Sequence, residues 1–338
     1  MRPRLLRTSA VVAATAAALL AFTGCASGAT GEPASSAASG TLGTVDTMFG
    51  TVEVPQPATA GDLKVVALGW SDAEMALALG VKPVGVYAWQ GFTEDTKGVG
   101  PWASSLFGDV TPTQLGGGET LNYEQIASLD PDVILNVRSD NDEETYKRLS
   151  EIAPTVYAPT GTGAFATDWA TQLTSISDAL GLADQGASLV SSTKADIAAA
   201  AAANPGFAGK TAVSAAKFGE AYGAYLPGDG RFDILADLGF VSAPAVTALG
   251  AGAFYAAVSV ENVAALDADV MVALPIGFTA AETSADPLLA SLPVVQDGRA
   301  IVLDPTSELA TAYSAASVLS IPVVLDQLVP LLAAAAAK

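Results

Sequence analysis

Histidine is absent from this 338-residue sequence, and cysteine occurs once, as Cys25. Without histidine a Ser-His-Asp triad is excluded and the usual general base is missing, which argues against a hydrolase. Zinc and manganese sites rely on imidazole or thiolate ligands, so a receptor for those free ions is disfavoured as well. A hydrolase that uses carboxylates alone is not excluded, but nothing in the sequence supports one. We therefore expect a protein that is not an enzyme and has no cofactor or metal site of its own.

Basic residues are also scarce. The chain has 15 lysines and arginines against 35 acidic residues, which gives a formal net charge of −20. Such a surface repels the phosphates of nucleic acids and anionic lipid headgroups. We expect no nucleic-acid partner, and attachment to a membrane would have to come from a lipid anchor.

The amino terminus has the pattern of a bacterial lipoprotein signal. Arginines at positions 2, 4 and 7 precede an uncharged stretch, residues 8–23, which is too short to span a bilayer as a mature helix. It ends in Phe22-Thr23-Gly24-Cys25, which resembles a lipobox with Phe22 where leucine is usual. We predict a signal peptide over residues 1–24, lipidation of Cys25, and an extracytoplasmic location on the outer face of the cytoplasmic membrane. The alternative is a secreted protein with one stray thiol.

The rest of the chain divides into a tether and an α/β region. Residues 25–61 are rich in Ala, Ser, Gly, Thr and Pro, which predicts a flexible tether. After Asp62 short apolar runs alternate with helical patterns, which is typical of α/β layers around a mostly parallel sheet. The expected strands are Val65–Leu68, Val84–Val86, Val133–Val137, Thr211–Ala215, Val270–Leu274 and Ala300–Leu303, and a helix is expected at Asp72–Leu79.

An alanine-rich stretch in the middle of the chain predicts a long helix. It is free of proline until Asn204-Pro205-Gly206 ends it, and about 20 residues at 1.5 Å each would be roughly 30 Å long, enough to join two lobes. We predict α/β lobes at residues 62–183 and 207–338, bridged by a helix at 184–206. Residues 318–337 are apolar but contain two prolines and an aspartate, which favours a packed terminal helix over a membrane span.

One helix-then-strand pattern occurs twice, as LNYEQIASLDPDVIL at residues 121–135 and VSVENVAALDADVMV at residues 258–272. In each copy a capping residue, Asn122 or Ser259, precedes a glutamate, Glu124 or Glu261, by two positions. This spacing places the carboxylate in the first helical turn, where the helix dipole favours negative charge. The glutamates are therefore either simple helix-start acids or groups that a partner recognises.

Seven motifs in order resemble the iron-siderophore class of solute-binding lipoproteins of ABC importers, a family with relatives for ferric hydroxamates, citrate, haem and cobalamin. They are VVALGWSDAEMALALGVKPVGV, GVGPW, LNYEQIASLDPDVIL, YKRLSEIAPTV, LPGDGRFDILADLGF, VSVENVAALDADVMV and DPLLASLPVVQDGRAIVLD. The resemblance runs from about Asp62 to about Leu332 and rests on their order. It implies two α/β lobes with central parallel sheets, bridged by one long rigid α-helix, and a ligand held in the cleft between the lobes.

The resemblance also implies partners. In the family one glutamate on each lobe docks onto positive residues of the dimeric permease, and Glu124 and Glu261 occupy the matching positions. The expected function is therefore capture of a ferric siderophore by a monomeric, lipid-anchored receptor and its delivery to an ABC permease driven by its ATPase. Haem or cobalamin is the alternative ligand, since a tyrosinate such as Tyr87 or Tyr225 could be an axial haem ligand. A purely structural surface lipoprotein is a further alternative.

Most of the candidate ligand-binding residues follow the ends of predicted strands, where parallel α/β lobes meet their ligands, whereas Trp102 stands in GVGPW and Tyr225 and Arg231 stand in AYLPGDGRF. Aromatic faces suit the organic shell of a siderophore and arginine suits its oxygens, while the chelate itself saturates the iron. These residues are Trp70, Tyr87, Trp89, Trp102 and Arg138 in the first lobe and Lys217, Phe218, Tyr225, Arg231 and Phe278 in the second.

Several of these assignments have alternatives. The resemblance implies that Arg231 lies in a ligand-binding glycine-rich turn and that Arg138 contacts anionic ferric chelates. Each aromatic could instead be ordinary packing, and Arg138 could form a surface ion pair with the acids of SDNDEE. Gly116-Gly117-Gly118 stands where hydroxamate-binding relatives often carry an arginine, which argues against a ferrichrome-like ligand. No G-K-[ST] follows these glycines, so a phosphate loop is disfavoured.

Overall fold

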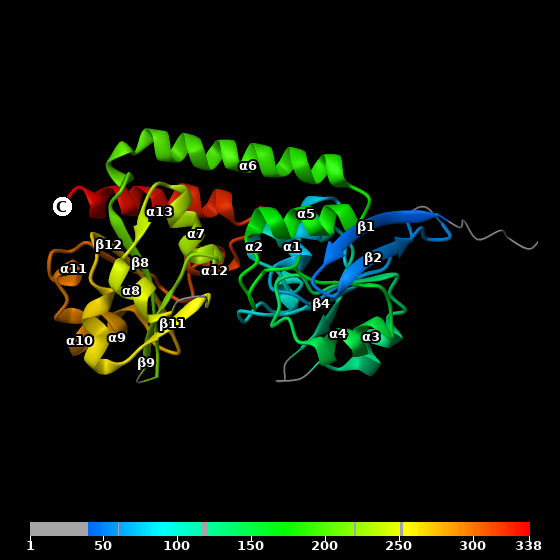
Figure 1. The fold of residues 1–338 in the computed structure, drawn as a ribbon, viewed down its shortest axis with the longest axis horizontal. Helices are drawn as coiled ribbons and strands as arrows, with labels where there is room; N and C mark the ends of the chain where they lie inside the picture. Colours follow the sequence, from blue (N-terminus) through cyan, green and yellow to red (C-terminus); the bar gives the residue numbers. More distant parts are fainter. Residues whose placement is uncertain (1–39, 60, 117–120, 220, 251–252) are drawn as a thin grey trace, which may run out of the picture. The chain divides into compact units, whose positions relative to one another are not determined.

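The computed structural model describes residues 40–338, except residues 60, 117–120, 220 and 251–252. The predicted signal peptide, Cys25, Gly117 and Gly118 lie outside the described residues. Within residues 40–338 the chain forms two α/β lobes joined by the helix α6 (Ala183–Ala203) (Figure 1). The predicted fold class, two lobes bridged by one long helix, is confirmed.

The N-lobe is built on a five-stranded parallel sheet with the order β5-β4-β3-β6-β7. Its central strands, β3 and β6, are buried on both faces, as their unbroken apolar runs predict. The strands are β3 (Val65–Ala67), β4 (Gly85–Tyr87), β5 (Thr113–Leu115), β6 (Val133–Leu135) and β7 (Thr155–Val156). The helices are α1 (Asp72–Ala78), η1 (Glu94–Thr96), α2 (Pro101–Ser104), η2 (Ser105–Phe107), α3 (Tyr123–Ser128), α4 (Glu143–Ser150) and α5 (Trp169–Ala179).

The C-lobe has a six-stranded mixed sheet with the order β11-β9-β8-β12-β13, and β10 pairs with β8. The pairs β8–β12 and β12–β13 are parallel, whereas β9 is antiparallel to both β8 and β11. The strands are β8 (Thr211–Phe218), β9 (Ala221–Tyr225), β10 (Val241–Ser242), β11 (Tyr255–Val258), β12 (Val270–Ile276) and β13 (Ala300–Val302). The helices are η3 (Pro205–Phe207), α7 (Gly230–Asp237), α8 (Pro244–Leu249), η4 (Val260–Leu266), α9 (Ala280–Ser284), α10 (Pro287–Ala290), α11 (Pro293–Gln296), α12 (Glu308–Ala315) and α13 (Ile321–Ala336).

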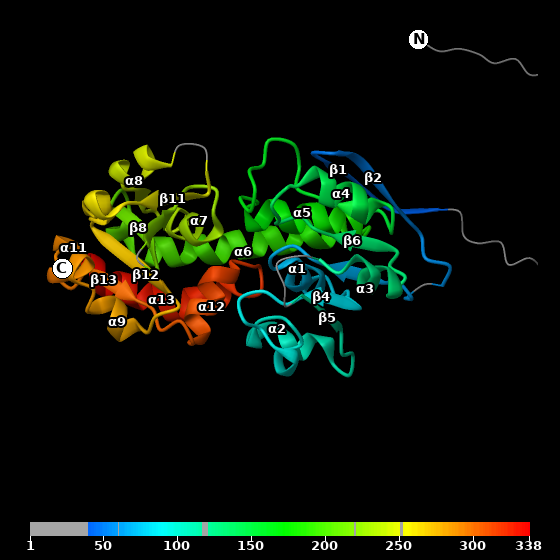
Figure 2. The same ribbon diagram turned by 90° about the horizontal axis from the view of Figure 1, so that it is seen from below.

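The bridging helix α6 packs on both lobes. It contacts α5 of the N-lobe and α7 and α13 of the C-lobe, and Figures 1 and 2 both show it running along the two. It buries Gly186, Thr193 and Ile197 and ends before Asn204-Pro205, as proline requires. This two-sided packing gives the lobes a common rigid support.

The corner between α12 and α13 provides a second link between the lobes. The Ser71 hydroxyl, at the start of α1, donates to the carbonyl oxygen of Ala315 at 2.9 Å. The Ser317 hydroxyl donates to the fully buried carboxylate of Glu74, which also accepts from the Trp102 indole nitrogen at 2.9 Å. These bonds fasten the C-terminal segment to α1 of the N-lobe.

The predicted tether at residues 25–61 is wrong for part of its length. Strands β1 (Thr41–Thr47) and β2 (Gly50–Pro55) form an antiparallel hairpin that packs on α5. It buries Val54 completely and Val45 and Val52 almost completely. A side chain at Gly43 would overlap the α5 carbonyls of Asp178 and Ala179, so glycine permits the close approach. The hairpin was not predicted because its valines stand singly among threonine and glycine, which gives no clear strand pattern.

The repeated motif folds differently in its two copies. In the first, the Asn122 side chain accepts from Gln125 N at 3.0 Å and caps α3 as predicted. In the second, η4 is a 3-10 helix and the Ser259 side chain accepts no capping bond from it. Both Glu124 and Glu261 are exposed.

The predicted terminal helix is confirmed as a packed element that begins at Ile321 and buries Val324, Leu328 and Leu332. No helix among the described residues has the length and apolar character needed to cross a membrane.

Candidate functional site: the N-lobe cavity and the junction of the lobes

Three aromatic rings form a stack at the carboxyl ends of the N-lobe strands. Trp70 lies just beyond β3 and Trp89 just beyond β4, with ring centroids 4.8 Å apart and planes at 7°. Phe165 stacks on Trp70 at 4.3 Å and lies 5.9 Å from Phe254 of the C-lobe. The two tryptophans that were selected for their places after strands thus lie against each other, and Phe165 joins their stack.

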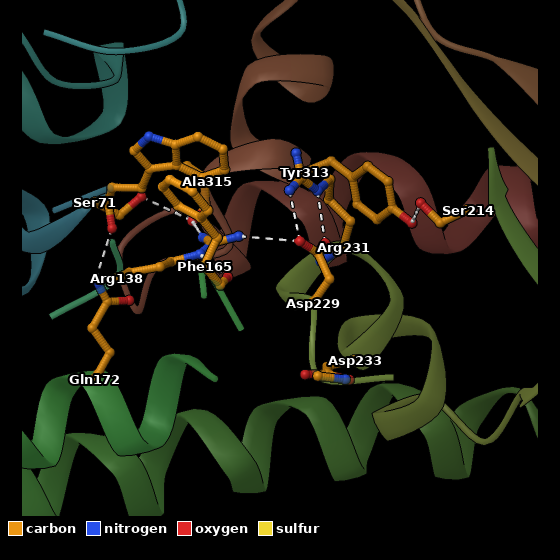
Figure 3. A network of polar contacts seen from close by, with 12 residues as sticks. Ser71, Arg138, Phe165, Gln172, Ser214, Asp229, Arg231, Asp233, Tyr313 and Ala315 are labelled. Carbon is orange, nitrogen blue, oxygen red and sulfur yellow. Dashed lines mark hydrogen bonds and ion pairs between the residues drawn. The ribbon is translucent and has the colours of Figure 1, made fainter. Parts of the chain in front are cut away.

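Arg138 lies beside this stack and is almost completely buried, with 1% of its surface exposed. Its Nη1 donates to the carbonyl oxygen of Ala315 at 2.9 Å and its Nε to that of Phe165 at 3.4 Å (Figure 3). Its Nη2 has no hydrogen-bond partner among the described residues and lies 3.7 Å from Oδ2 of Asp229. Burial lowers the pKa of Arg138 to about 10, so it stays protonated at neutral pH. The alternative of a surface ion pair with the SDNDEE acids is wrong, because the charged partner comes from the other lobe.

Asp229 and Arg231 form a tight pair on the C-lobe. The guanidinium groups of Arg138 and Arg231 both face the Asp229 carboxylate (Figure 3). Only Arg231 forms hydrogen bonds with it, from Nε at 2.7 Å and from Nη2 at 2.6 Å. Asp229 also caps α7 by accepting from Arg231 N at 2.9 Å. Burial alone would lower the pKa of Arg231, but the adjacent carboxylate raises it above its ordinary value. The guanidinium carbon lies 3.7 Å from the Tyr225 ring centroid, so Tyr225 supports Arg231.

A cavity of about 470 Å³ opens beside Arg138 at the N-lobe edge. Trp70, Tyr87, Arg138 and Phe165 line it, and its rim carries Arg148, whose guanidinium carbon lies 3.6 Å from the Tyr123 ring centroid. Three acids at the start of α4 complete the rim, namely Asp140, Asp142 and Glu144. The cavity thus offers aromatic faces and the exposed guanidinium of Arg148 to a ligand, while Arg138 lies almost completely buried beside it.

The remaining C-lobe candidates form a separate group at the ends of β8 and β12. Lys217 Nζ lies 3.3 Å from Asp286, donates to the carbonyl oxygen of Gly219 at 2.9 Å and sits 5.4 Å from the Phe278 ring centroid. Phe218 is 39% exposed and its ring is 6.1 Å from that of Tyr255. Tyr255 in turn is 5.5 Å from Tyr225, so ring contacts connect this group to the arginine cluster.

The position of Trp102 is explained by its packing and not by contact with the cavity. Its indole donates to Glu74, and its ring contacts Phe92, which contacts Trp89. Trp102 therefore supports the stack from behind, and it does not line the 470 Å³ cavity.

Three groups at the site escaped the sequence analysis. Asp229 follows β9, a strand that was not predicted, but has a signal in PGDGRF, since an aspartate at a helix start is a common cap. Phe165 and the Ala315 carbonyl have none, because they reach Arg138 from positions 27 and 177 residues away. No cluster of ligands that could hold a metal ion is found in the described part of the chain.

Comparisons with known proteins agree with this architecture. The sequence family described as "Periplasmic binding protein" matches residues 65–306. The solved periplasmic solute binding protein from Mycobacterium smegmatis str. MC2 155 is 31% identical with a TM-score of 0.74, over 87% of this chain and 98% of its own. PiaA from Streptococcus pneumoniae TIGR4, in complex with ferrichrome, is 26% identical with a TM-score of 0.73 over 87% and 98%.

A curated relative, the probable siderophore-binding lipoprotein YfiY of Bacillus subtilis (strain 168), is 35% identical over 133 residues. This match covers 39% of this chain and spans only 37% of the relative's length. Because the family match covers well over half of the sequence and the fold agrees over both lobes, the chain belongs to the periplasmic binding protein family, as its ordered motifs predicted.

Proposed function

We propose that this protein is the substrate-binding lipoprotein of an ABC importer, which captures a ferric siderophore between its lobes and delivers it to the membrane permease. The observation that carries the proposal is Arg138, a buried guanidinium with an unoccupied nitrogen beside the Trp70 stack. The names of two relatives, a probable siderophore-binding lipoprotein and PiaA with ferrichrome, support the same class of ligand.

The chemistry of the cleft suits a chelate that brings its own iron ligands. Aromatic faces such as Trp70 and Tyr87 contact the organic shell, and a guanidinium binds an oxygen of the chelate. Binding and release require no covalent step, so the protein acts as a receptor.

Delivery requires a partner, which we propose to be the dimeric permease with its ATPase. Glu124 and Glu261 are exposed, one on each lobe, and each stands in the first turn of its helix. Two acids on two similar lobes suit a partner with two equivalent halves. We further propose that Cys25 carries the lipid that holds this monomeric receptor on the outer face of the membrane.

Haem and cobalamin are the competing ligands. Burial raises the pKa of Tyr225, and its ring supports Arg231, so Tyr225 is a poor source of an axial tyrosinate. Tyr87 lines the cavity and is the better candidate for haem. Haem carries two propionates that could pair with an arginine as a chelate oxygen does, so the titration below, and not Arg138, separates haem from a ferric chelate.

The test is a titration of the soluble chain, cut after Cys25, with ferric hydroxamate, carboxylate and catecholate siderophores, haem and cobalamin. Tryptophan fluorescence reports binding, because Trp70 and Trp89 lie in the site. We expect saturable quenching by a ferric chelate, weakened at least about tenfold by Arg138→Gln, since a charge-assisted hydrogen bond is lost.

The matched control is Lys64→Gln, which removes a positive charge at the amino end of β3, opposite the cleft. It should leave the affinity unchanged. Quenching by haem or cobalamin alone, or an equal loss in both variants, would contradict the proposal.

A further inference from the structure

The turn of the β1–β2 hairpin carries an aromatic side chain, Phe49, that packs on α4. Its ring stacks on Tyr146 of that helix, with centroids 4.4 Å apart and planes at 17°. Phe49 also meets Tyr157 edge to face at 5.1 Å, and Tyr146 meets Tyr157 edge to face at 5.5 Å. Each of these three rings therefore contacts the other two, and together they form a three-ring cluster.

Hydrogen bonds fix the turn that presents Phe49. The Thr47 hydroxyl donates to the carbonyl oxygen of Gly50 at 2.8 Å and accepts from Phe49 N at 3.2 Å. Met48 N donates to the carbonyl oxygen of Ala158 at 2.9 Å, which ties the turn to the segment just beyond β7. The position of the Phe49 ring is therefore set by the hairpin and by its attachment to the N-lobe.

The helix α4 is attached to the N-lobe by few of its side chains. Of its eight residues Leu149 is buried, Thr145 and Tyr146 are half-buried, and the other five are exposed. Tyr146 thus supplies much of the contact that holds this helix, and Phe49 is its stacking partner. An aromatic pair of this kind stabilises a structure beyond the area that it buries. We expect α4 to loosen when the ring of Phe49 is removed.

Both tyrosines of the three-ring cluster are joined to residues that line the 470 Å³ cavity. Tyr146 stands on α4 between Thr145 and Arg148, which both line the cavity. The Tyr157 hydroxyl accepts a hydrogen bond at 2.8 Å from Nδ2 of Asn136, which is buried and lines the cavity as well. A displacement of either tyrosine would therefore move groups of the cavity wall.

We propose that Phe49 is a positioning residue for the ligand cavity, whose ring holds α4 and Asn136 in the places where they meet a bound ferric siderophore. The inference rests on the proposed function and extends the binding machinery to the hairpin, although none of the described hairpin residues lines the cavity. Phe49 acts through Tyr146 and Tyr157 without touching the siderophore. A smaller side chain at this position leaves a void in the cluster, so α4 shifts and affinity falls.

Two truncations in the hairpin separate positioning from stability. Phe49→Ala removes the ring at the turn, whereas Val54→Ala shortens a fully buried side chain of β2, in the hairpin that packs on α5. Both should lower the melting temperature, because each leaves a void. Only Phe49→Ala should also weaken siderophore binding, by at least about fivefold, because it alone opens the three-ring cluster. Phe49→Tyr keeps the stacked ring and should bind within about twofold of wild type.

Affinity and local opening are measured on the same proteins. The chain that begins at residue 26 is titrated with ferrichrome, ferric citrate and ferric enterobactin, one chelate from each of the hydroxamate, carboxylate and catecholate classes, and quenching of tryptophan fluorescence reports binding. Hydrogen exchange of the α4 amides is followed without a chelate. We expect these amides to exchange faster in Phe49→Ala than in Val54→Ala, because a loosened helix opens more often.

The outcomes separate this inference from the proposed function. If none of the three chelates binds the wild-type chain, the proposed function fails and this inference with it. If one binds but Phe49→Ala keeps wild-type affinity, or Val54→Ala loses as much, only the inference is overturned. Unchanged exchange of the α4 amides in Phe49→Ala would overturn it as well. Should Phe49→Ala not fold in a thermal melt, Phe49→Leu decides, because it fills most of the void without a stacked ring and should still lose at least about threefold in affinity.

Discussion

Buried charges at the junction of the lobes have unequal roles. Arg138 and Arg231 flank Asp229, whereas Asp233, one turn further along α7, accepts a hydrogen bond from Gly228 N at 2.8 Å and forms no ion pair among the described residues. Figure 3 shows Asp233 facing α6, away from the arginines. Burial therefore penalises the charge of Asp233, and the hydrogen bond from Gly228 N offsets only part of that penalty.

Replacing Asp233 should stabilise the protein in a pH-dependent way. Burial raises the pKa of Asp233 from 3.8 to about 7, so between these values the unfolded chain releases a proton that the folded chain retains. Stability is then lost as pH rises through that window, and the loss is complete above it. Asp233→Asn keeps the acceptor for Gly228 N and should be more stable than wild type at pH 8, by about 1–3 kcal/mol, but not at pH 4.

Urea unfolding of both proteins at the two pH values measures this difference. Gains of equal size at pH 4 and pH 8 would mean that the charge of Asp233 is not responsible.

Sequence reasoning found some of the residues of the site. The rule that ligands meet the carboxyl ends of parallel strands located Trp70, Trp89 and Arg138, because each follows a recognisable apolar strand. It could not find Phe165, whose place depends on how a long loop returns to β6. Nor could it tell that Arg231 binds Asp229 of its own lobe, or that Arg138 meets the same carboxylate at 3.7 Å, which depends on the approach of the two lobes.

Among the secondary-structure elements, α6 has one position at which the helix lies against α5 with no room for a side chain. Gly186 stands there, and a Cβ added to it would overlap Oγ and Cβ of Ser177. Gly186→Ala should therefore destabilise the protein by about 1–3 kcal/mol, although alanine is the better helix former. Thermal unfolding measures the change.

The double variant Ser177→Gly/Gly186→Ala removes the overlap and should recover part of the loss. Gly206→Ala is the matched control, because a Cβ at Gly206 meets no atom within 4 Å. If Gly186→Ala were as stable as that control, α6 would not be packed as closely on α5 as the structure has it.

Strands were predicted correctly where their hydrophobic sequence pattern was strong. Val65–Leu68 and Val133–Val137 were found because central parallel strands are apolar on both faces. The strand β9, with the sequence AYGAY, was missed because alanine and glycine give no clear alternation. The mixed character of the C-lobe sheet follows from β9 and β11, so it was missed as well.

For the whole molecule, the two exposed glutamates provide the test of delivery. Reversing both charges, as Glu124→Lys/Glu261→Lys, should abolish uptake of iron-labelled siderophore in cells, because the proposed contacts with positive permease residues become repulsive. Ligand affinity of the purified variant should stay at the wild-type value, since neither residue lines the 470 Å³ cavity beside Arg138.

The control Glu151→Lys/Asp326→Lys makes the same change in net charge at two other exposed acids and should leave uptake intact. If the docking variant lost affinity and uptake together, Glu124 and Glu261 would belong to the ligand site or to the fold and not to a permease interface.

The two-lobed architecture was predictable because motif order extends over most of the chain and the long alanine-rich helix stands between two α/β series. The contacts that join the lobes were not, since Ser71, Glu74 and Arg138 meet the α12–α13 corner from more than 170 residues away. Such contacts depend on the final packing and leave no local pattern.

We propose above all that a ferric chelate binds at the junction of the lobes, beside Trp70 and Arg138. An anomalous difference map at the iron absorption edge, from crystals grown with the chelate that binds most tightly, locates the metal directly. We expect a single iron peak beside Trp70, in the cavity that Trp70, Tyr87 and Phe165 line. An iron peak elsewhere, for example in the 710 Å³ groove that Thr44, Asp168 and Lys194 line, would contradict it.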